Sequence, residues 1–123
     1  MEFKEKQKEW AAWKYFVMAR SQKEYLYLRG LFSGNQWSSE KTKLFNEALK
    51  RVQKMPENSK AKRNAYEHVW GYFKKQASDQ EREVFFEKLA GLSDEQDEVL
   101  SYLKKLNQKY RVPYLQSSKL FKE

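Results

Sequence analysis

Apolar side chains recur along the chain every three or four residues, the spacing that places them on one face of a helix. These stripes predict six helices and no strand, at about residues 2–20, 22–32, 39–55, 60–77, 79–90 and 94–110. The short connections between them are typical of antiparallel neighbours in a bundle. We therefore predict that residues 1–123 form an all-α fold, a compact single-domain bundle of about six helices. The last ten or so residues are expected to be a tail, extended or in one short turn.

Local motifs mark the ends of several helices. Three Ser-x-x-Glu/Gln motifs are typical of capping boxes and are expected to start helices two, five and six: Ser21 with Glu24, Ser78 with Glu81, and Ser93 with Gln96. Asn58 or Ser59 is expected to cap the fourth helix. Pro56 and Gly91 follow the third and fifth helices, and both residue types end helices readily.

Composition narrows the classes of fold and site. With no Ile, one Thr and six Val, 7 of 123 residues are β-branched, which argues against a β-sandwich or a parallel sheet. The 4 Trp, 8 Tyr and 8 Phe supply enough bulk for a core. The absence of Cys excludes disulfides, thiolate zinc, an iron–sulfur cluster held by this chain and a Cys nucleophile. The single histidine, His68, excludes a site built from several histidines.

The sequence shows neither a membrane-spanning stretch nor an export signal. No stretch approaches 18 apolar residues, and the first six residues are charged rather than typical of a signal peptide. We expect a soluble, cytoplasmic protein without a membrane partner.

Charge is segregated along the chain. The formal net charge is +8, and it divides into +2 over residues 1–40, +7 over 41–75, −6 over 76–98 and +5 over 99–123. Two basic blocks around an acidic one favour a polarised surface that attracts polyanions. A Lys-rich surface that serves only solubility is the plainer interpretation of the same pattern.

The fourth predicted helix carries the most informative face. At 100° per residue, Tyr66, Val69, Trp70, Phe73 and Ala77 form its apolar stripe. The opposite side brings together Asn64, His68, Gly71 and Lys75. A glycine inside a helix costs about 1 kcal/mol relative to alanine, so we expect another backbone or a ligand to approach Gly71 closely. Tyr72 lies beside this face and is suited to stack a base.

Each of these features also has a structural interpretation. A lone histidine on a helix is most often a packing or surface residue, and aromatic stripes at helical spacing are usually core. Catalysis finds little support, because Glu67 does not face His68 on a helix and the four glycines form no phosphate loop. A small lyase or nuclease with His68 as general acid or base stays an alternative. The acidic residues 94–98 fit a helix N-terminus, so we expect no metal and no cofactor.

Three motifs resemble a known family. Asn64, His68 and the run Gly71-Tyr72-Phe73-Lys74-Lys75 resemble the signature of the YbgA-like family, a bacterial helical domain of unknown function. Its opening helix is similar to Trp10-Ala-Ala-Trp13-Lys14-Tyr15 followed by Met18-Ala19-Arg20-Ser21 and Tyr25. Its closing motif is similar to Pro113-Tyr114-Leu115. The matches keep the family's order over about residues 10–116.

The resemblance implies a role in binding RNA. Such domains stand alone or are fused to a cysteine-rich, cluster-bearing desulfidase that removes sulfur from thiolated uracil in tRNA, and the helical part is associated with holding the RNA. This chain would be the RNA-holding part alone, acting in trans. It departs from the family at Trp13, where a histidine is usual, and in a shorter segment before Pro113. The ending after that motif is kept only by Gln116 and Phe121.

The sequence therefore predicts a non-catalytic nucleic-acid-binding module, most suited to structured RNA such as tRNA. Lys60, Lys62, Arg63, Lys74 and Lys75 are expected to contact phosphates, and a more discriminating patch is expected from Asn64, His68, Tyr72 and Lys14. A protein-interaction module that docks an acidic or cluster-bearing partner, such as a separate desulfidase, is the first alternative. DNA also remains open as the polyanion, because charge alone does not separate it from RNA.

Overall fold

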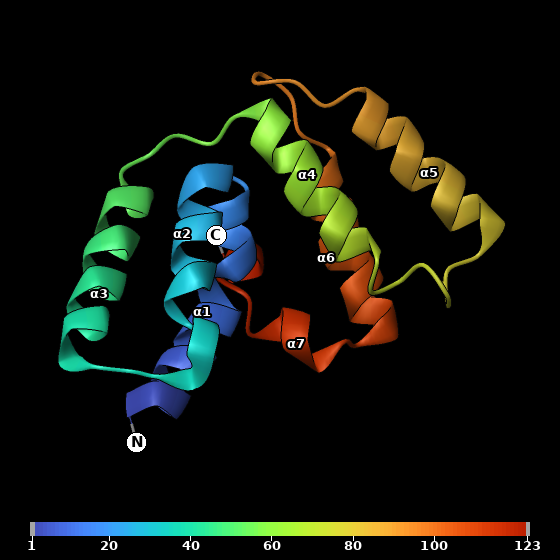
Figure 1. The fold of residues 1–123 in the computed structure, drawn as a ribbon. Helices are drawn as coiled ribbons and strands as arrows, with labels where there is room; N and C mark the ends of the chain where they lie inside the picture. The colour runs from blue at the N-terminus through green and yellow to red at the C-terminus, as the bar shows by residue number, and fades with distance from the viewer. Residues whose placement is uncertain (1, 123) are drawn as a thin grey trace.

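Helices make up the regular structure of residues 2–122, the range that the computed structural model describes. No strand forms in this range, which confirms the all-α prediction. Figure 1 shows the seven α-helices, and two short 3₁₀-helices complete the set. Their bounds are α1 Glu2–Met18, α2 Gln22–Leu31, η1 Ser33–Asn35, α3 Ser39–Gln53, α4 Ser59–Trp70, α5 Asp79–Ala90, α6 Val99–Tyr110, α7 Pro113–Gln116 and η2 Lys119–Lys122. None of these helices is long and apolar enough to cross a membrane.

The first helix lies at the centre of the molecule. It contacts α2, α3, α4, α7 and η2, while α5 and α6 pack on the far side of α4 (Figure 1). The C-terminal end of α1 is surrounded on all sides, because its last four residues and the residue that follows them are buried: Tyr15, Phe16, Val17, Met18 and Ala19. A helix that is apolar all round is one that lies inside a core.

The apolar stripe of α4 faces inward as predicted. Tyr66, Val69, Trp70 and Phe73 are all buried, and the Trp70 ring stacks on Phe85 of α5 with 4.6 Å between ring centroids. This packing directs the opposite side of α4, with Asn64 and His68, away from the core.

The fourth helix ends at Trp70, so its predicted extension to residue 77 is wrong. Gly71 caps it, and residues 71–76 continue as successive turns.

The expectation that another part of the chain approaches Gly71 closely is also wrong. A Cβ there would lie 3.0 Å from the carbonyl oxygen of His68, and nothing beyond this local turn comes within 4 Å. The glycine therefore tightens the turn, and Lys75 lies past the end of the helix.

The sixth helix begins at Val99 rather than at residue 94. Ser93 and Gln96 close a turn on themselves, since the amide of Ser93 donates to the Gln96 carbonyl over 2.9 Å. Asp97 caps the helix instead, accepting from the amides of Val99 and Leu100 over 2.9 and 3.2 Å. Asp94 serves a different helix, because its carboxylate accepts from the amide of Ser59 at the start of α4 over 2.7 Å.

The predicted tail is helical and belongs to the core. Pro113 starts α7, where its fixed φ suits the first helical position. Leu115 and Leu120 are fully buried, and η2 packs against α1. Of the two forms expected, an extended tail or one short turn, the structure is closer to the second, with one short turn in α7 and another in η2. Two leucines five residues apart anchor these turns to the bundle.

The starts of α5, α2 and α4 follow their predicted capping motifs to different extents. Ser78 and Glu81 form a complete capping box at α5. Ser21 accepts from the amide of Glu24 at α2, but the Glu24 side chain pairs with Arg51 of α3 over 2.7 Å. That ion pair fastens α2 to α3. Asn58, rather than Ser59, caps α4.

Glu81 is expected to make folding sensitive to acid. Its carboxylate accepts from Tyr110, from the Ser78 amide and from Lys109 over 2.5, 2.9 and 3.0 Å, and these bonds lower its pKa to about 2. A carboxyl with a folded pKa below its unfolded value of about 4.3 contributes stability above roughly pH 5 that is lost as the pH falls toward 2. The urea midpoint of the wild-type protein should therefore fall between pH 7 and pH 3 more than that of Glu81→Gln.

Glu83→Gln on the same helix is the matched control, because Glu83 is exposed. It should keep the wild-type dependence. Equal pH dependence in Glu81→Gln and the wild-type protein would show that the bonds to Glu81 add nothing to acid stability.

Candidate functional site

A polar row on the outer side of α4 carries three of the predicted site residues, Lys60, Asn64 and His68, spaced four residues apart. The Asn64 side-chain amide donates to the Gln22 Oε1 of α2 over 3.0 Å. His68 Nδ1 lies 2.8 Å from the carbonyl oxygen of Asn64. Because a carbonyl oxygen only accepts, Nδ1 carries the proton and Nε2 is left for a ligand. The row is thus ordered by α4 itself and by α2.

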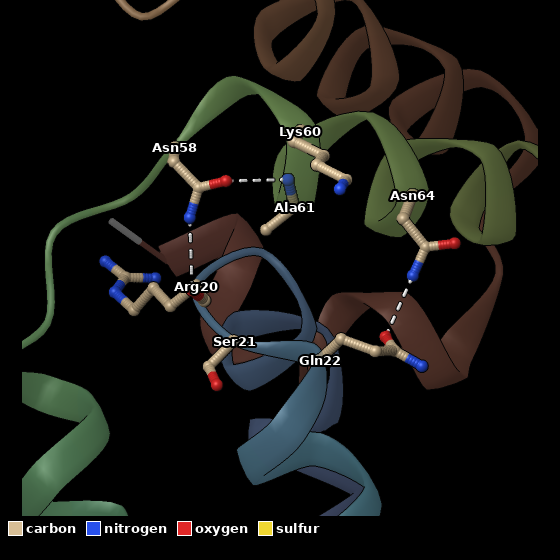
Figure 2. A pocket seen from close by; sticks show the side chains of 7 residues that line it. All are labelled: Arg20, Ser21, Gln22, Asn58, Lys60, Ala61 and Asn64. Carbon is tan, nitrogen blue, oxygen red and sulfur yellow. Dashed lines mark hydrogen bonds between the residues drawn. The ribbon is translucent and has the colours of Figure 1, made fainter.

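A hollow of about 520 Å³ lies where the turn before α2 meets the start of α4. We call it the α2–α4 hollow. Asn58 and Asn64 bridge its two ends in Figure 2: Asn58 donates to the Arg20 carbonyl over 3.2 Å, and Asn64 bonds Gln22. Lys60 is the exposed cation at this hollow. The lining residues are Arg20, Ser21, Gln22, Asn58, Lys60, Ala61 and Asn64.

Three tyrosines meet beyond the end of α4 and form what we call the tyrosine cluster: Tyr15, Tyr72 and Tyr114. The hydroxyls of Tyr15 and Tyr72 lie 2.9 Å apart, and the ring of Tyr72 stacks on Tyr114 at 5.7 Å. Burial and the bond to Tyr72 raise the pKa of Tyr15 far above its usual value, so its hydroxyl stays neutral. Tyr72 and Tyr114 are each 37% exposed. Their rings are therefore fixed in place and open to stacking.

Lys14 lies beside the tyrosine cluster. Its Nζ is 5.6 Å from the centroid of the Tyr15 ring. Burial, followed by the nearby charge of Arg29, lowers the pKa of Lys14. Two cations from α1 and α2 thus repel each other here, and a bound anion would relieve that repulsion.

A second hollow, of about 390 Å³, lies between the turns after α4 and the link from α6 to α7. We call it the α6–α7 hollow. Its walls include the predicted site residues Tyr72 and Lys75, together with Tyr110 and Arg111. No acidic residue is among those that line it. It combines two cations with two aromatic rings.

The predicted phosphate contacts divide into two groups. Among the residues that the structure describes, Lys60, Lys74 and Lys75 are exposed, Arg63 is half-buried, and none of the four has an ion pair. Lys62 differs, because its side chain is 13% exposed and pairs with Glu57 and Asp97 over 3.5 and 3.3 Å. The charge of Lys62 is therefore used inside the protein, and we leave it out of the candidate surface.

The surroundings of His68 do not form a catalytic arrangement. His68 is exposed and lines neither hollow. Within residues 2–122, the ring of His68 bonds the backbone carbonyl of Asn64 and has no carboxylate or lysine as a hydrogen-bond partner. General acid–base catalysis needs such a partner and a place for substrate. The same range holds no cluster of three or more metal-ligating side chains.

A family model described as "Protein of unknown function (DUF1722)" matches residues 14–123. The chain belongs to this family. No curated protein and no solved structure matches it. The DUF1722 match begins at Lys14 and so includes each candidate residue named above, while the family description states no activity.

Sequence reasoning missed three residues of this DUF1722 surface: Gln22, Tyr114 and Arg111. No sequence pattern pointed to Gln22, because it contributes to this surface through its hydrogen bond with Asn64. Tyr114 was placed in a tail. Arg111 follows the last residue of α6, a position where glycine or asparagine is usual, and an arginine there is a signal that could have been noticed.

Proposed function

We propose that this protein is a non-catalytic nucleic-acid-binding module that holds structured RNA, such as a tRNA, along α4. The observation that carries the proposal is one continuous row of polar and cationic side chains. It runs from Lys60 and Asn64 at the α2–α4 hollow, over His68, to Tyr72 and Lys75 at the α6–α7 hollow. From Lys60 to His68 the row advances eight residues along α4, which at about 1.5 Å rise per residue is roughly 12 Å.

The state of the charges supports the proposal. The unpaired cations Lys60, Arg63, Lys74 and Lys75 belong to this surface, whereas several carboxylates are engaged elsewhere. Glu24, Glu57, Glu81, Asp94 and Asp97 are held by ion pairs or by backbone amides at helix starts. The surplus positive charge is thereby left to attract phosphates.

RNA is favoured over duplex DNA by the exposed rings. Sequence-selective proteins bind RNA through unstacked bases that stack on aromatic side chains and through the 2′-hydroxyl. Tyr72 and Tyr114 offer such rings, and His68 Nε2 offers an acceptor to a hydroxyl.

The resemblance to the YbgA-like family supports the choice of tRNA. A domain that holds RNA for a cluster-bearing desulfidase needs no cofactor of its own, and this chain has no Cys with which to bind a cluster. We propose that it acts in trans beside such an enzyme, in the cytoplasm.

A binding titration tests the proposal. Purified protein is titrated with bulk tRNA and with a DNA duplex of matched length, at about 50 and 200 mM salt. Four phosphate contacts, at about 0.7–0.9 each in the slope of log K against log salt, should weaken tRNA binding roughly 50- to 150-fold between the two conditions. tRNA binding should survive excess DNA.

Two results would count against the proposal. Weak and equal binding to both nucleic acids would show that the charge of the protein is only generically attractive. Stoichiometric recovery of one acidic protein after nuclease treatment, with no tRNA binding, would show a protein-docking module instead.

A further inference from the structure

The backbone of Arg111 adopts an unfavourable conformation. Its φ and ψ are 52° and 56°, in the left-handed region, and no other non-glycine residue from 2 to 122 has a positive φ. Asn107 explains why the chain turns here, since its carbonyl accepts from the Arg111 amide over 2.7 Å and its side chain from the Val112 amide over 2.9 Å. Glycine or asparagine would satisfy the same turn with less strain. The bonds do not explain why the residue is an arginine.

The side-chain environment offers a reason. Arg111 lines the α6–α7 hollow together with Lys75, Tyr72 and Tyr110. At about 390 Å³ the hollow lies within the range of about 300–1,000 Å³ typical of small-molecule sites. Arg111 is exposed, and neither it nor Lys75 has an ion pair among the described residues.

The carboxylate bonded to Tyr110, one of the residues that line the hollow, is already satisfied. Glu81 accepts from the Tyr110 hydroxyl and pairs with Lys109 over 3.0 Å. These bonds fix the ring of Tyr110 and leave Arg111 and Lys75 as the uncompensated charges of the hollow. An anion placed between them would meet no carboxylate on the walls.

The second half of the argument is the tyrosine cluster. Tyr72 belongs both to the cluster and to the walls of the hollow. Its hydroxyl is held by Tyr15 and its ring by Tyr114, so the exposed ring does not need to be ordered when a ligand stacks on it. An anion site and an ordered aromatic ring therefore share one hollow.

We propose that the α6–α7 hollow takes one unstacked nucleotide of the bound RNA. Its phosphate lies between Lys75 and Arg111, and its base stacks on Tyr72. Arginine suits this place because its planar guanidinium bonds a phosphate through two parallel N–H groups. The inference rests on the proposed function and adds to it a defined nucleotide subsite.

Arg111→Gly separates a structural from a binding role. Glycine accepts the left-handed conformation, so the melting temperature should stay the same or rise. The affinity for tRNA at about 50 mM salt should fall three- to tenfold, and the salt slope should become shallower by about 0.7–0.9. Arg111→Lys keeps the charge and should recover most of the affinity. Arg82→Gln on α5 is the control, because Arg82 is exposed and lines neither hollow.

A second measurement reads the hollow directly. Uridine 5′-monophosphate is titrated into isotope-labelled protein, and the backbone amide signals of Tyr72, Lys75 and Arg111 are followed. They should shift in the wild-type protein and in Tyr72→Phe, and shift much less in Arg111→Gly and Tyr72→Leu.

The outcomes distinguish this inference from the proposal on which it rests. Salt-steep tRNA binding that is unchanged in Arg111→Gly, together with shifts from uridine monophosphate that are also unchanged, overturns the subsite and leaves the RNA-binding function standing. A wild-type protein that binds neither tRNA nor the mononucleotide overturns both. A lower melting temperature in Arg111→Gly would contradict the strain argument.

Discussion

Reversing two charges, Lys74→Glu together with Lys75→Glu, is expected to lower the affinity for tRNA at least tenfold at about 50 mM salt. Both lysines are exposed and carry no ion pair among the described residues, so the substitutions remove the proposed phosphate contacts without breaking an internal ion pair. Each lysine also becomes a repelling carboxylate, and both effects weaken binding most at low salt. The titration used for the wild-type protein measures the change, and the melting temperature verifies the fold.

A matched control separates this surface from overall charge. Lys4→Glu with Lys8→Glu changes the net charge by the same amount, from +8 to +4, at exposed positions in the first turns of α1. These positions lie near the end of α1 marked N in Figure 1, away from α4. The control should keep most of the affinity. Equal losses in the two double variants would mean that tRNA responds to net charge and that Lys74 and Lys75 are not contacts.

The pattern of apolar residues predicted the helices better than their ends. The stripe of α4 and the box at Ser78 were right, because both depend on residues within one or two turns of each other. The end of α4 and the start of α6 were wrong for another local reason. The apolar periodicity continues past Gly71, although the chain there tightens from a helix into turns. The Ser93 motif, in turn, is as compatible with a closed loop as with the start of a helix.

The candidate surface shows a different limit. Asn64, His68 and Tyr72 were predictable, because all three lie on or directly after one helix. The side chains that complete the surface come from α2, from the end of α6 and from α7. No periodicity connects Gln22 with Asn64, which are 42 residues apart, or Tyr114 with Tyr72. Such pairs depend on how the helices pack.

Lys62 shows how a charge run can mislead. It lies between Lys60 and Arg63, and by composition alone the three resemble one solvated basic patch. The helix turns Lys62 toward Asp97, before α6, so that one lysine of the run serves the interior. This placement makes Asp97 the residue on which several internal contacts depend.

Asp97→Ala is therefore expected to destabilise the protein by roughly 3 kcal/mol. The carboxylate caps α6, accepts from the hydroxyl of the fully buried Tyr66 over 2.5 Å, and pairs with Lys62 over 3.3 Å. Burial alone would raise the pKa of Asp97, but the bond from Tyr66 and the contacts around it lower that pKa, so the group is held ionised. The melting temperature should fall by about 10 °C or more. Thermal and urea unfolding measure the effect.

Asp97→Asn is the matched variant, because its side-chain oxygen can still cap α6 while the charge that Lys62 needs is gone. It should be intermediate in stability. Lys62→Met, in turn, should lower the melting temperature while the folded protein keeps its affinity for tRNA, because the Lys62 ammonium is committed to Asp97 and Glu57. A phosphate-contacting lysine would behave in the opposite way, with the stability kept and the affinity lost. Comparing Lys62→Met with the charge reversal at Lys74 and Lys75 therefore assigns each lysine to the interior or to the RNA surface.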